Sequence, residues 1–409
     1  MEALAHLSAH GRDGKVSARR SSKVAEVFRR HGDSYLAKHP VTPEQAKVLR
    51  AVMRCRTAAL GGHLEVCDQC GFSRPAYNSC RDRHCPSCQA FAQHRWLEKR
   101  LKHILSTHHF HVVFTLPAEL RPLARRNAKV VYDTLFDAAS ETLDTLGRQR
   151  MGARVGATVV LHTWTRKMLF HPHVHCVVTG GGVSLDGQRW VAASKRFLFP
   201  VAQMRKLFRG IVRRRLRDAY DQGRLDLDGG CAKWADPKAF ARLLRGLHRK
   251  KWVVYAKRPF AGPEQVFSYL GRYTHRVAIS DHRVLSVDEG AVAFRTKNGG
   301  VETVEPHEFI RRFLLHVLPF RFHKIRHYGL YSSAHVRRLW PVARRLLGAP
   351  VPVQDDEDEF DDDEDWEALA ERLVGEDHRR CPACGEGFLR RTPLPKPPVL
   401  AGPPWMDSS

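Results

Sequence analysis

The residues best suited to chemistry in this sequence are the histidines of residues 171–175, which read HPHVH. A Val-rich run and then three glycines follow, and this pattern of period two predicts a strand that ends at the glycines. Because side chains two apart on a strand share a face, His173 and His175 point one way, and Cys176 points the other way, into a core. Two imidazoles on one strand face can bind a metal ion; a solvated face that carries histidines by chance is the alternative.

A second chemical feature is the segment of residues 262–276, GPEQVFSYLGRYTHR. A Pro-Glu pair opens a predicted helix, on which Gln265, Tyr269 and Tyr273 recur every fourth residue and so share one face. Packing of both tyrosines in a core is the alternative. The segment already has a separate apolar side and carries cationic residues beside the tyrosines, which favours a functional role for the two phenols.

Six of the ten cysteines lie between residues 55 and 88. Two Cys-x-x-Cys pairs there predict one tetrahedral, structural Zn²⁺ site with the ligands Cys67, Cys70, Cys85 and Cys88. The other metal-binding residues of the segment alternate with these pairs and could form a second zinc site with the ligands Cys55, His63, Cys80 and His84. The alternative is a single zinc ion, with the two histidines on the surface.

The chain of 409 residues carries a formal net charge of +25, with a pI near 10.0. Such a surplus indicates a polyanionic partner, either nucleic acid or an anionic membrane surface. No apolar run reaches the roughly 18–20 residues of a membrane span, and the N-terminal residues lack the apolar core of a signal peptide. We therefore expect a cytoplasmic protein without a membrane partner, in which the cysteines are reduced and bind metal.

An acidic tract, residues 355–377, holds 14 acidic residues and one basic residue. Its composition predicts a disordered linker; the alternative is a tract that mimics nucleic acid and folds back on the basic surface. A Cys-x-x-Cys knuckle, formed by Cys381 and Cys384, follows it, and then a Pro-rich end. One knuckle cannot complete a tetrahedral zinc site, so it recruits His378 or a distant ligand, or it holds no metal.

Strands and helices interleave along the rest of the chain. Apolar periodicity predicts strands over residues 108–117, 156–164, 171–182 and 251–260, a hairpin with an Asn298-Gly299 turn, and helices over residues 24–40, 42–55, 121–147 and 201–220. Because no βαβ unit repeats, we expect an α+β fold, an antiparallel sheet with helices on its faces. The two N-terminal helices are expected to brace the zinc module.

This organisation predicts five parts. They are a helical N-terminal arm, a zinc-binding module that contacts DNA, a catalytic domain, an acidic disordered linker, and a tail with the Cys knuckle and the Pro-rich end, at residues 1–50, 51–95, 100–345, 350–377 and 378–409.

The motifs in this order resemble those of a known family. The cysteine module, HTW followed by HPHVHCVVTGGG, and YLGRYTHRVAIS are similar to those of the two-tyrosine HUH transposases of rolling-circle insertion sequences, of the type usually numbered ninety-one. Residues 322–332, FHKIRHYGLYS, fit the same resemblance, which covers roughly residues 25–345. It implies an HUH endonuclease core preceded by a transposase zinc-binding domain.

The resemblance also implies an activity and its residues. His173-Val174-His175 would be the metal motif, and Tyr269 and Tyr273 would be the nucleophiles of a metal-dependent DNA endonuclease and strand transferase. Such an enzyme nicks and rejoins single-stranded DNA at insertion-sequence ends through 5′-phosphotyrosine intermediates.

Elementary chemistry agrees with these roles. A phenol, with an ordinary pKa of about 10, needs help to attack a phosphodiester, and a divalent ion at His173 and His175 can supply it. Mg²⁺ or Mn²⁺ prefers nearly six ligands. Gln265, one helical turn before Tyr269, is the predicted third ligand, and His162 on the neighbouring strand is the next candidate.

Basic residues beside these motifs are expected to bind DNA phosphates: Arg81, Arg83, Arg272, Arg276, Lys324 and Arg326. The sequence has no P-loop for a helicase motor, so we expect a host helicase to supply single-stranded DNA in the nucleoid of a bacterial cytoplasm; DNA that is already single-stranded is the alternative. Two rival functions share much of this pattern: a plasmid relaxase or replication initiator of the same chemistry, and a zinc-dependent DNA-binding regulator without catalysis. A metallohydrolase that adds His171 to the histidine pair leaves the tyrosines and the charge unexplained.

Overall fold

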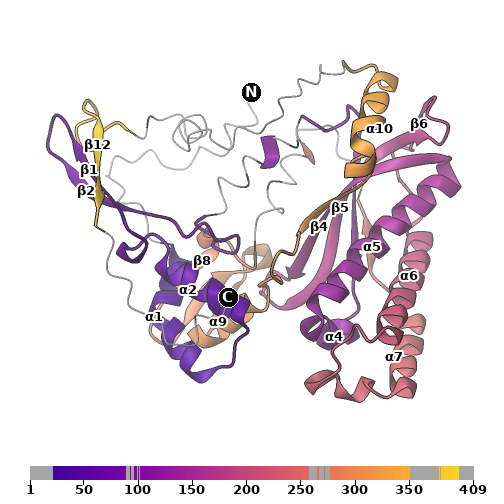
Figure 1. The fold of residues 1–409 in the computed structure, drawn as a ribbon, viewed down its shortest axis with the longest axis horizontal. Coiled ribbons are helices and arrows are strands. Elements are labelled where there is room, and N and C mark those ends of the chain that lie inside the picture. The colour runs from indigo at the N-terminus through magenta and orange to yellow at the C-terminus, as the bar shows by residue number, and fades with distance from the viewer. Residues whose placement is uncertain are drawn as a thin grey trace.

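The structure is a computed structural model that describes residues 22–88, 93, 96–98, 100, 102–257, 265–266, 271, 277–350, 377 and 379–395. The described residues form a large sheet covered by helices, a smaller unit of helices and a hairpin, and a three-stranded ribbon (Figure 1). Within these residues no helix combines the length and the apolar character needed to cross a membrane.

The largest sheet has six strands, all paired antiparallel, in the order β11-β4-β5-β3-β7 with β6 paired to β5. Its strands are β3 (His109–Thr115), β4 (Ala153–Trp164), β5 (Phe170–Ser184), β6 (Trp190–Ala192), β7 (Val254–Ala256) and β11 (Ile325–Gly329). The prediction of an α+β fold built on an antiparallel sheet is confirmed. The hairpin of β4 and β5 is the centre of this sheet, and it carries the predicted histidines.

Helices cover one face of this sheet, as Figure 1 shows for α5 and α6. They are α4 (Arg121–Arg126), α5 (Ala128–Leu146), α6 (Val201–Asp221) and α7 (Pro237–Arg249). The predicted single helix over residues 121–147 is interrupted at Asn127, because the Asn127 side chain exchanges hydrogen bonds of 2.6 and 2.8 Å with the backbone of Asp226. The core beneath contains Phe110 and Phe114 of β3 and Phe208 of α6, all fully buried.

The three glycines do not end the strand, as the sequence pattern predicted; β5 continues through them to Ser184. Close neighbours explain why glycine is needed here. A Cβ atom at Gly180 would lie 2.4 Å from the His108 ring, and one at Gly182 would lie 2.4 Å from the carbonyl oxygen of Arg154 on β4. These glycines therefore permit close approach within the sheet, which is the other common role of glycine in a strand.

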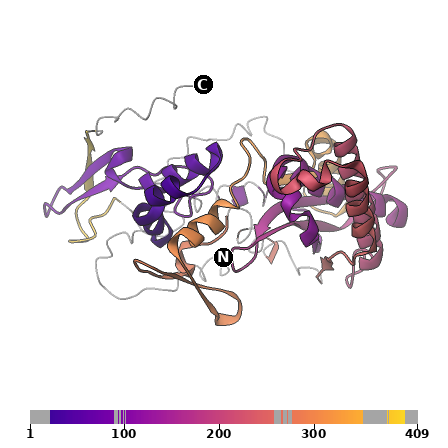
Figure 2. The same ribbon diagram turned by 90° about the horizontal axis from the view of Figure 1, so that it is seen from below.

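A second unit joins the N-terminal helices to residues 277–314. It contains α1 (Lys23–Lys38), α2 (Pro43–Arg54), β8 (Val284–Val287), β9 (Val292–Arg295), β10 (Val301–Val304) and α9 (Pro306–Leu314), and Figure 2 shows the indigo N-terminal helices beside the orange segment. Its core includes Phe28 and Phe313, whose ring centres lie 5.0 Å apart. The predicted hairpin turn is confirmed, because Asn298 and Gly299 adopt φ angles of 56° and 78°.

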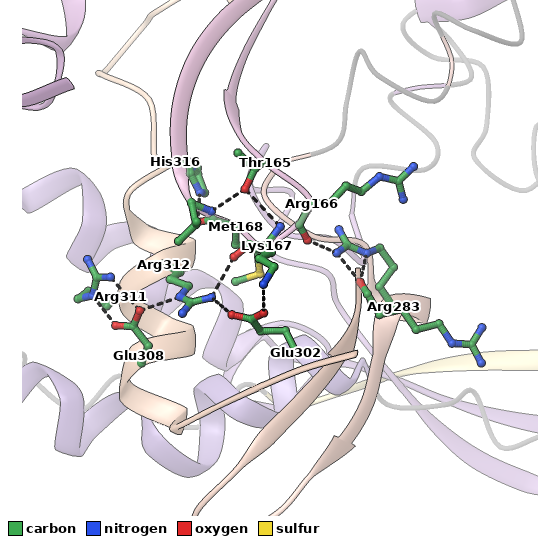
Figure 3. A network of polar contacts seen from close by, with 12 residues as sticks. Thr165, Arg166, Lys167, Met168, Arg283, Glu302, Glu308, Arg311, Arg312 and His316 are labelled. Atoms are coloured by element: carbon green, nitrogen blue, oxygen red, sulfur yellow. Dashed lines mark hydrogen bonds and ion pairs between the residues drawn. The ribbon is translucent and has the colours of Figure 1, made fainter. Parts of the chain in front are cut away.

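Polar contacts attach this unit to the turn between β4 and β5 (Figure 3). Lys167 of the turn pairs with Glu302 of β10 at 2.9 Å, and Arg312 of α9 donates to the carbonyl of Lys167 at 3.1 Å. Arg283 donates to the carbonyl of Arg166. The second unit therefore holds the turn that connects the two histidine-bearing strands.

The third part is a ribbon of β1 (Gly62–Cys67), β2 (Ser73–Tyr77) and β12 (Leu389–Leu394), in the order β12-β1-β2. The predicted division put the zinc module and the C-terminal tail in separate parts, whereas the structure pairs β12 of the tail with β1 along six residue pairs. Before the tail, α10 (Ser333–Leu346) packs near β5 through Trp340 and Ala343. Short helical turns lie at Ala58–Leu60, Ala118–Leu120, Gly147–Met151, Gly229–Trp234, Asp281–Arg283 and Lys297–Gly299.

A buried histidine makes the contact between α9 and the β4–β5 turn sensitive to pH. His316 is 1% exposed, and its Nε2 donates to the carbonyl of Met168 at 3.0 Å (Figure 3). Its Nδ1 accepts from the Thr163 hydroxyl at 3.1 Å. Burial lowers the pKa of His316 to about 4, whereas the unfolded chain keeps a pKa of about 6.5. The stability that neutral His316 contributes is therefore present above pH 6.5 and is lost as the pH falls towards 4.

We predict that protonation of His316 lowers the free energy of unfolding by about 2 kcal/mol when the pH is lowered from 7.5 to 5. The variant His316→Gln cannot titrate in this range. Its free energy of unfolding, measured with denaturant at both pH values, should therefore fall by about 2 kcal/mol less than that of the wild type. An equal fall in the two proteins would contradict the prediction.

Candidate functional site

Three histidines meet on the face of the large sheet opposite α5 and α6. His173 and His175 of β5 alternate with Val174 and Cys176, which face the core beneath the helices. His162 of β4 lies directly opposite His173 in the strand register. The candidate ligand atoms of the three histidines all lie within 4.8 Å of one another. The sheet thus brings His162, the second candidate for the third ligand, next to the predicted pair.

Hydrogen bonds orient the rings of this histidine set. The Nδ1 of His173 donates to the carbonyl of His171 at 2.6 Å, so Nε2 is the nitrogen that can bind a metal ion. His111 of β3 places its Nε2 2.9 Å from Nδ1 of His175, with the two rings parallel. When His175 binds a metal through Nε2, its Nδ1 carries the proton and donates to His111, as second nitrogens of metal-bound histidines do. Sequence reasoning missed His111, although it alternates with the apolar residues of its strand.

The environment keeps these imidazoles neutral, the form that binds metal. Burial lowers the pKa of His173 to about 4 and that of His111 to about 3. Burial also holds the pKa of His175 well below its ordinary value, and Lys324 adds to the shift. The Nζ of Lys324 lies 4.9 Å from the ring centre of Trp164, at the end of β4. A positive side chain therefore stands beside the histidines, where an anionic phosphate would be attracted.

One described residue of the predicted tyrosine segment, Val266, packs on the same sheet face. Val266 is buried with Val160 of β4 and Val177 of β5, two positions that share the face of the histidines. Gln265 is exposed beside Val266, and its part as a metal ligand stays a prediction. The two predicted nucleophiles and two of the predicted DNA-binding residues lie outside the described residues: Tyr269, Tyr273, Arg272 and Arg276.

Two other residues that were predicted to bind DNA, Arg83 and Arg326, contact other parts of the protein. Arg83 donates to the carbonyls of Phe322 and Pro319 at 2.6 and 2.9 Å. Arg326 pairs with Asp133, and its guanidinium lies 4.3 Å from the ring centre of Phe136. These contacts hold both arginines in place, and their role in DNA binding stays a prediction. Arg81, which is exposed, and Lys324 stay predicted phosphate ligands.

The cysteines form two clusters that correct the predicted grouping. The first cluster consists of Cys55, Cys80, Cys85 and Cys88, and the second of Cys67, Cys70, Cys381 and Cys384. Neighbouring sulfur atoms lie 3.5 or 3.6 Å apart in the first cluster and 3.6 or 3.8 Å apart in the second. Four thiolates around Zn²⁺, with Zn–S bonds of about 2.3 Å, would place their sulfurs about 3.8 Å apart. Both clusters therefore fit a structural zinc ion.

The two histidines of the predicted second zinc site are engaged elsewhere. His84 is buried; its Nδ1 donates to Asp82 at 3.0 Å, and its Nε2 accepts the backbone N–H of Leu318 at 3.2 Å. Both nitrogens are used, so neither can bind a metal ion in this arrangement. The Nε2 of His63 lies 3.4 Å from the carboxylate of Glu65. The predicted set of two cysteines and two histidines is thus replaced by a set of four cysteines.

Comparison with known proteins identifies the class and then the family. A profile described as a transposase zinc-binding domain matches residues 27–116, and one described as a putative transposase matches residues 156–338. The protein is a transposase. It belongs to the HUH transposase family of insertion sequences of type ninety-one, as the resemblance implied.

Two relatives define this membership. A putative transposase of Sinorhizobium fredii, y4qJ, is 46% identical over 381 residues, which are 91% of this chain and 95% of the relative. The transposase for insertion sequence element IS801 of Pseudomonas savastanoi pv. phaseolicola is 26% identical over 349 residues, or 83% of this chain and 82% of the relative. No solved structure matches this chain. Family membership implies a DNA substrate, and the zinc-binding domain agrees with the two cysteine clusters.

Proposed function

We propose that this transposase nicks and rejoins single-stranded DNA at insertion-sequence ends, with Tyr269 and Tyr273 as nucleophiles. The observation that supports the proposal best is the face of β4 and β5 on which three histidines meet, beside Val266, three residues before Tyr269. His173 and His175 would hold Mg²⁺ or Mn²⁺, with His162 or Gln265 as the third protein ligand. When bound, the ion would withdraw charge from the scissile phosphate and position it.

Strand joining by these residues would need no ATP. Attack of a tyrosine oxygen on the scissile phosphorus forms a 5′-phosphotyrosine ester; the DNA 3′-oxygen leaves and takes up a proton as a 3′-hydroxyl. One ester replaces another, so the 3′-hydroxyl of a second strand can later displace the tyrosine by the reverse reaction. Two tyrosines allow one to hold the first DNA end while the other cleaves. Lys324 would bind DNA phosphate beside the histidines, and a host helicase in the bacterial nucleoid would supply the single strand.

The test is a covalent adduct between the protein and labelled single-stranded DNA from the element's own end. With Mg²⁺ or Mn²⁺ the wild type should form an adduct that survives SDS, because a phosphotyrosine is an ester and not an electrostatic contact. The variants Tyr269→Phe and Tyr273→Phe each remove one oxygen atom and should leave the fold intact. Each single variant should still cleave but fail to complete strand transfer, and the double variant should form no adduct on a denaturing gel.

Three outcomes would redirect the proposal. An SDS-stable adduct with the double Phe variant would show that another residue is the nucleophile. A wild type that binds its terminal DNA tightly but forms no adduct would favour the DNA-binding regulator. Cleavage of a plasmid origin in preference to the element's ends would favour the relaxase or replication initiator.

A further inference from the structure

We propose that the second cysteine cluster is a zinc clasp that fastens the C-terminal tail to the N-terminal ribbon. The clasp consists of Cys67 and Cys70 from the N-terminal region and Cys381 and Cys384 from the tail. The tail cysteines lie outside the matched zinc-binding domain, which covers residues 27–116. One ion would then bind ligands that are more than 300 positions apart in the sequence.

Backbone N–H groups point at cysteine sulfur atoms in both halves of the clasp. In the first half, the backbone N–H groups of Gln69 and Cys70 point at Cys67 Sγ at 3.4 and 3.5 Å. In the second half, the N–H of Ala383 points at Cys381 Sγ at 3.4 Å, and that of Gly387 at Cys384 Sγ at 3.4 Å. Such N–H···S contacts stabilise thiolates, the form of cysteine that binds zinc.

The strands between the knuckles show that the tail is part of the ribbon's fold. Glu65 of β1 is 1% exposed and pairs with Arg74 of β2 at 2.8 Å and with Arg391 of β12 at 3.2 Å. Without the tail, this buried carboxylate would keep only one of the two arginines, a costly loss for a buried charge. The edge of β1 that now pairs with β12 would also be left open.

Further contacts fix the tail knuckle to the ribbon turn. The side chain of Asp68 accepts the backbone N–H of Phe388 at 2.7 Å, and the backbone N–H of Asp68 donates to the carbonyl of Phe388 at 3.1 Å. Cys67, Cys381 and Leu389 pack in one small apolar cluster. The ribbon is therefore built from both ends of the chain, and a cut anywhere between Pro350 and Asp377 should leave the tail attached as long as zinc is bound.

The proposal is tested in the full-length protein with a specific protease site inserted between Asp362 and Asp363. After cleavage, size-exclusion chromatography in about 1 M NaCl removes electrostatic adhesion of the acidic fragment, because charges are then screened within about 3 Å. We expect the C-terminal fragment to elute with the rest of the protein and to separate from it when a strong zinc chelator is added. Metal analysis of the uncut protein should give two zinc ions per chain.

The variant Cys384→Ser should bind one zinc ion fewer and should lose the fragment on cleavage without a chelator. The variant Cys231→Ser is the matched control, because Cys231 is a buried cysteine outside both clusters; it should keep both the zinc and the fragment. Loss of the fragment from cleaved wild type without a chelator would overturn the clasp. A Cys384→Ser variant that keeps two zinc ions, or that retains the fragment after cleavage, would overturn it as well.

Discussion

Replacing His173 and His175 together by alanine should reduce formation of the SDS-stable DNA adduct by about 10³-fold or more. The reason is that both imidazoles contribute to the three-histidine set on β4 and β5, and a single remaining histidine cannot hold a divalent ion. A bound ion stabilises the charge that develops at a phosphate by several kcal/mol, and each 1.4 kcal/mol is about a factor of ten in rate. Quantitative denaturing gels, with and without EDTA, measure the effect.

The affinity of the double variant for the same DNA should show whether the variant has lost only its catalytic activity or also its folded structure. Because binding depends mainly on Arg and Lys contacts to phosphates, the double variant should keep a Kd within about twofold of the wild type. The pair His39 and His307, whose nitrogens lie 3.3 Å apart in the second unit, offers a matched control. Replacing both of these by alanine should leave adduct formation unchanged. If the His173 and His175 variant still forms a divalent-ion-dependent adduct at the wild-type rate, the histidine face is not the metal site.

The histidine face could be predicted in part from the sequence. Alternation with Val174 and Cys176 was enough to place His173 and His175 on one face, because the period of a strand is local information. The position of His162 opposite His173 depends on the register between β4 and β5. Register is set by the packing of whole strands and by the turn that the second unit holds, so His162 could be predicted only as an alternative ligand.

The glycines after the histidines show how one residue type supports two interpretations. The sequence pattern predicts that the strand ends at Gly180 to Gly182, because glycine is common in turns. Glycine also occurs where neighbouring backbone comes close, and here Cβ atoms would collide with His108 and with β4. The choice between the two roles depends on neighbours that are distant in sequence, which the local pattern does not contain.

The grouping of the cysteines also depends on residues that are distant in sequence. Two knuckles separated by 14 residues suggested one site, because ligands close in sequence usually share an ion. In the structure β1 turns Cys67 towards the tail, while Cys85 lies with Cys55 in the core of the second unit. The sequence does contain a sign of this arrangement. Cys55 and Cys80, together with the lone knuckle that begins at Cys381, provide enough further cysteines for two sites of four thiolates each.

The two cysteine clusters should therefore differ in what their loss does to the protein. Cys55 and Cys85 of the first cluster are buried and pack in the core formed by α1, α2 and α9. Cys70 and Cys384 of the second cluster are exposed on the ribbon. Loss of zinc from the first cluster leaves thiols without their metal inside a core, whereas loss from the second frees a ribbon at the edge of the molecule.

We predict that Cys85→Ser and Cys70→Ser each lower the zinc content by one ion but have unequal effects on stability. The binding free energy of a structural zinc, about 10 kcal/mol or more, is comparable with the whole stability of a domain. Cys85→Ser should therefore unfold the second unit, with rapid proteolysis within residues 22–54 and 277–314. Cys70→Ser should leave these segments protected and expose the ribbon strands to the protease instead. Limited proteolysis with mass spectrometry identifies the cut sites, and the same cleavage pattern in both variants would show that the two zinc sites support one cooperative unit.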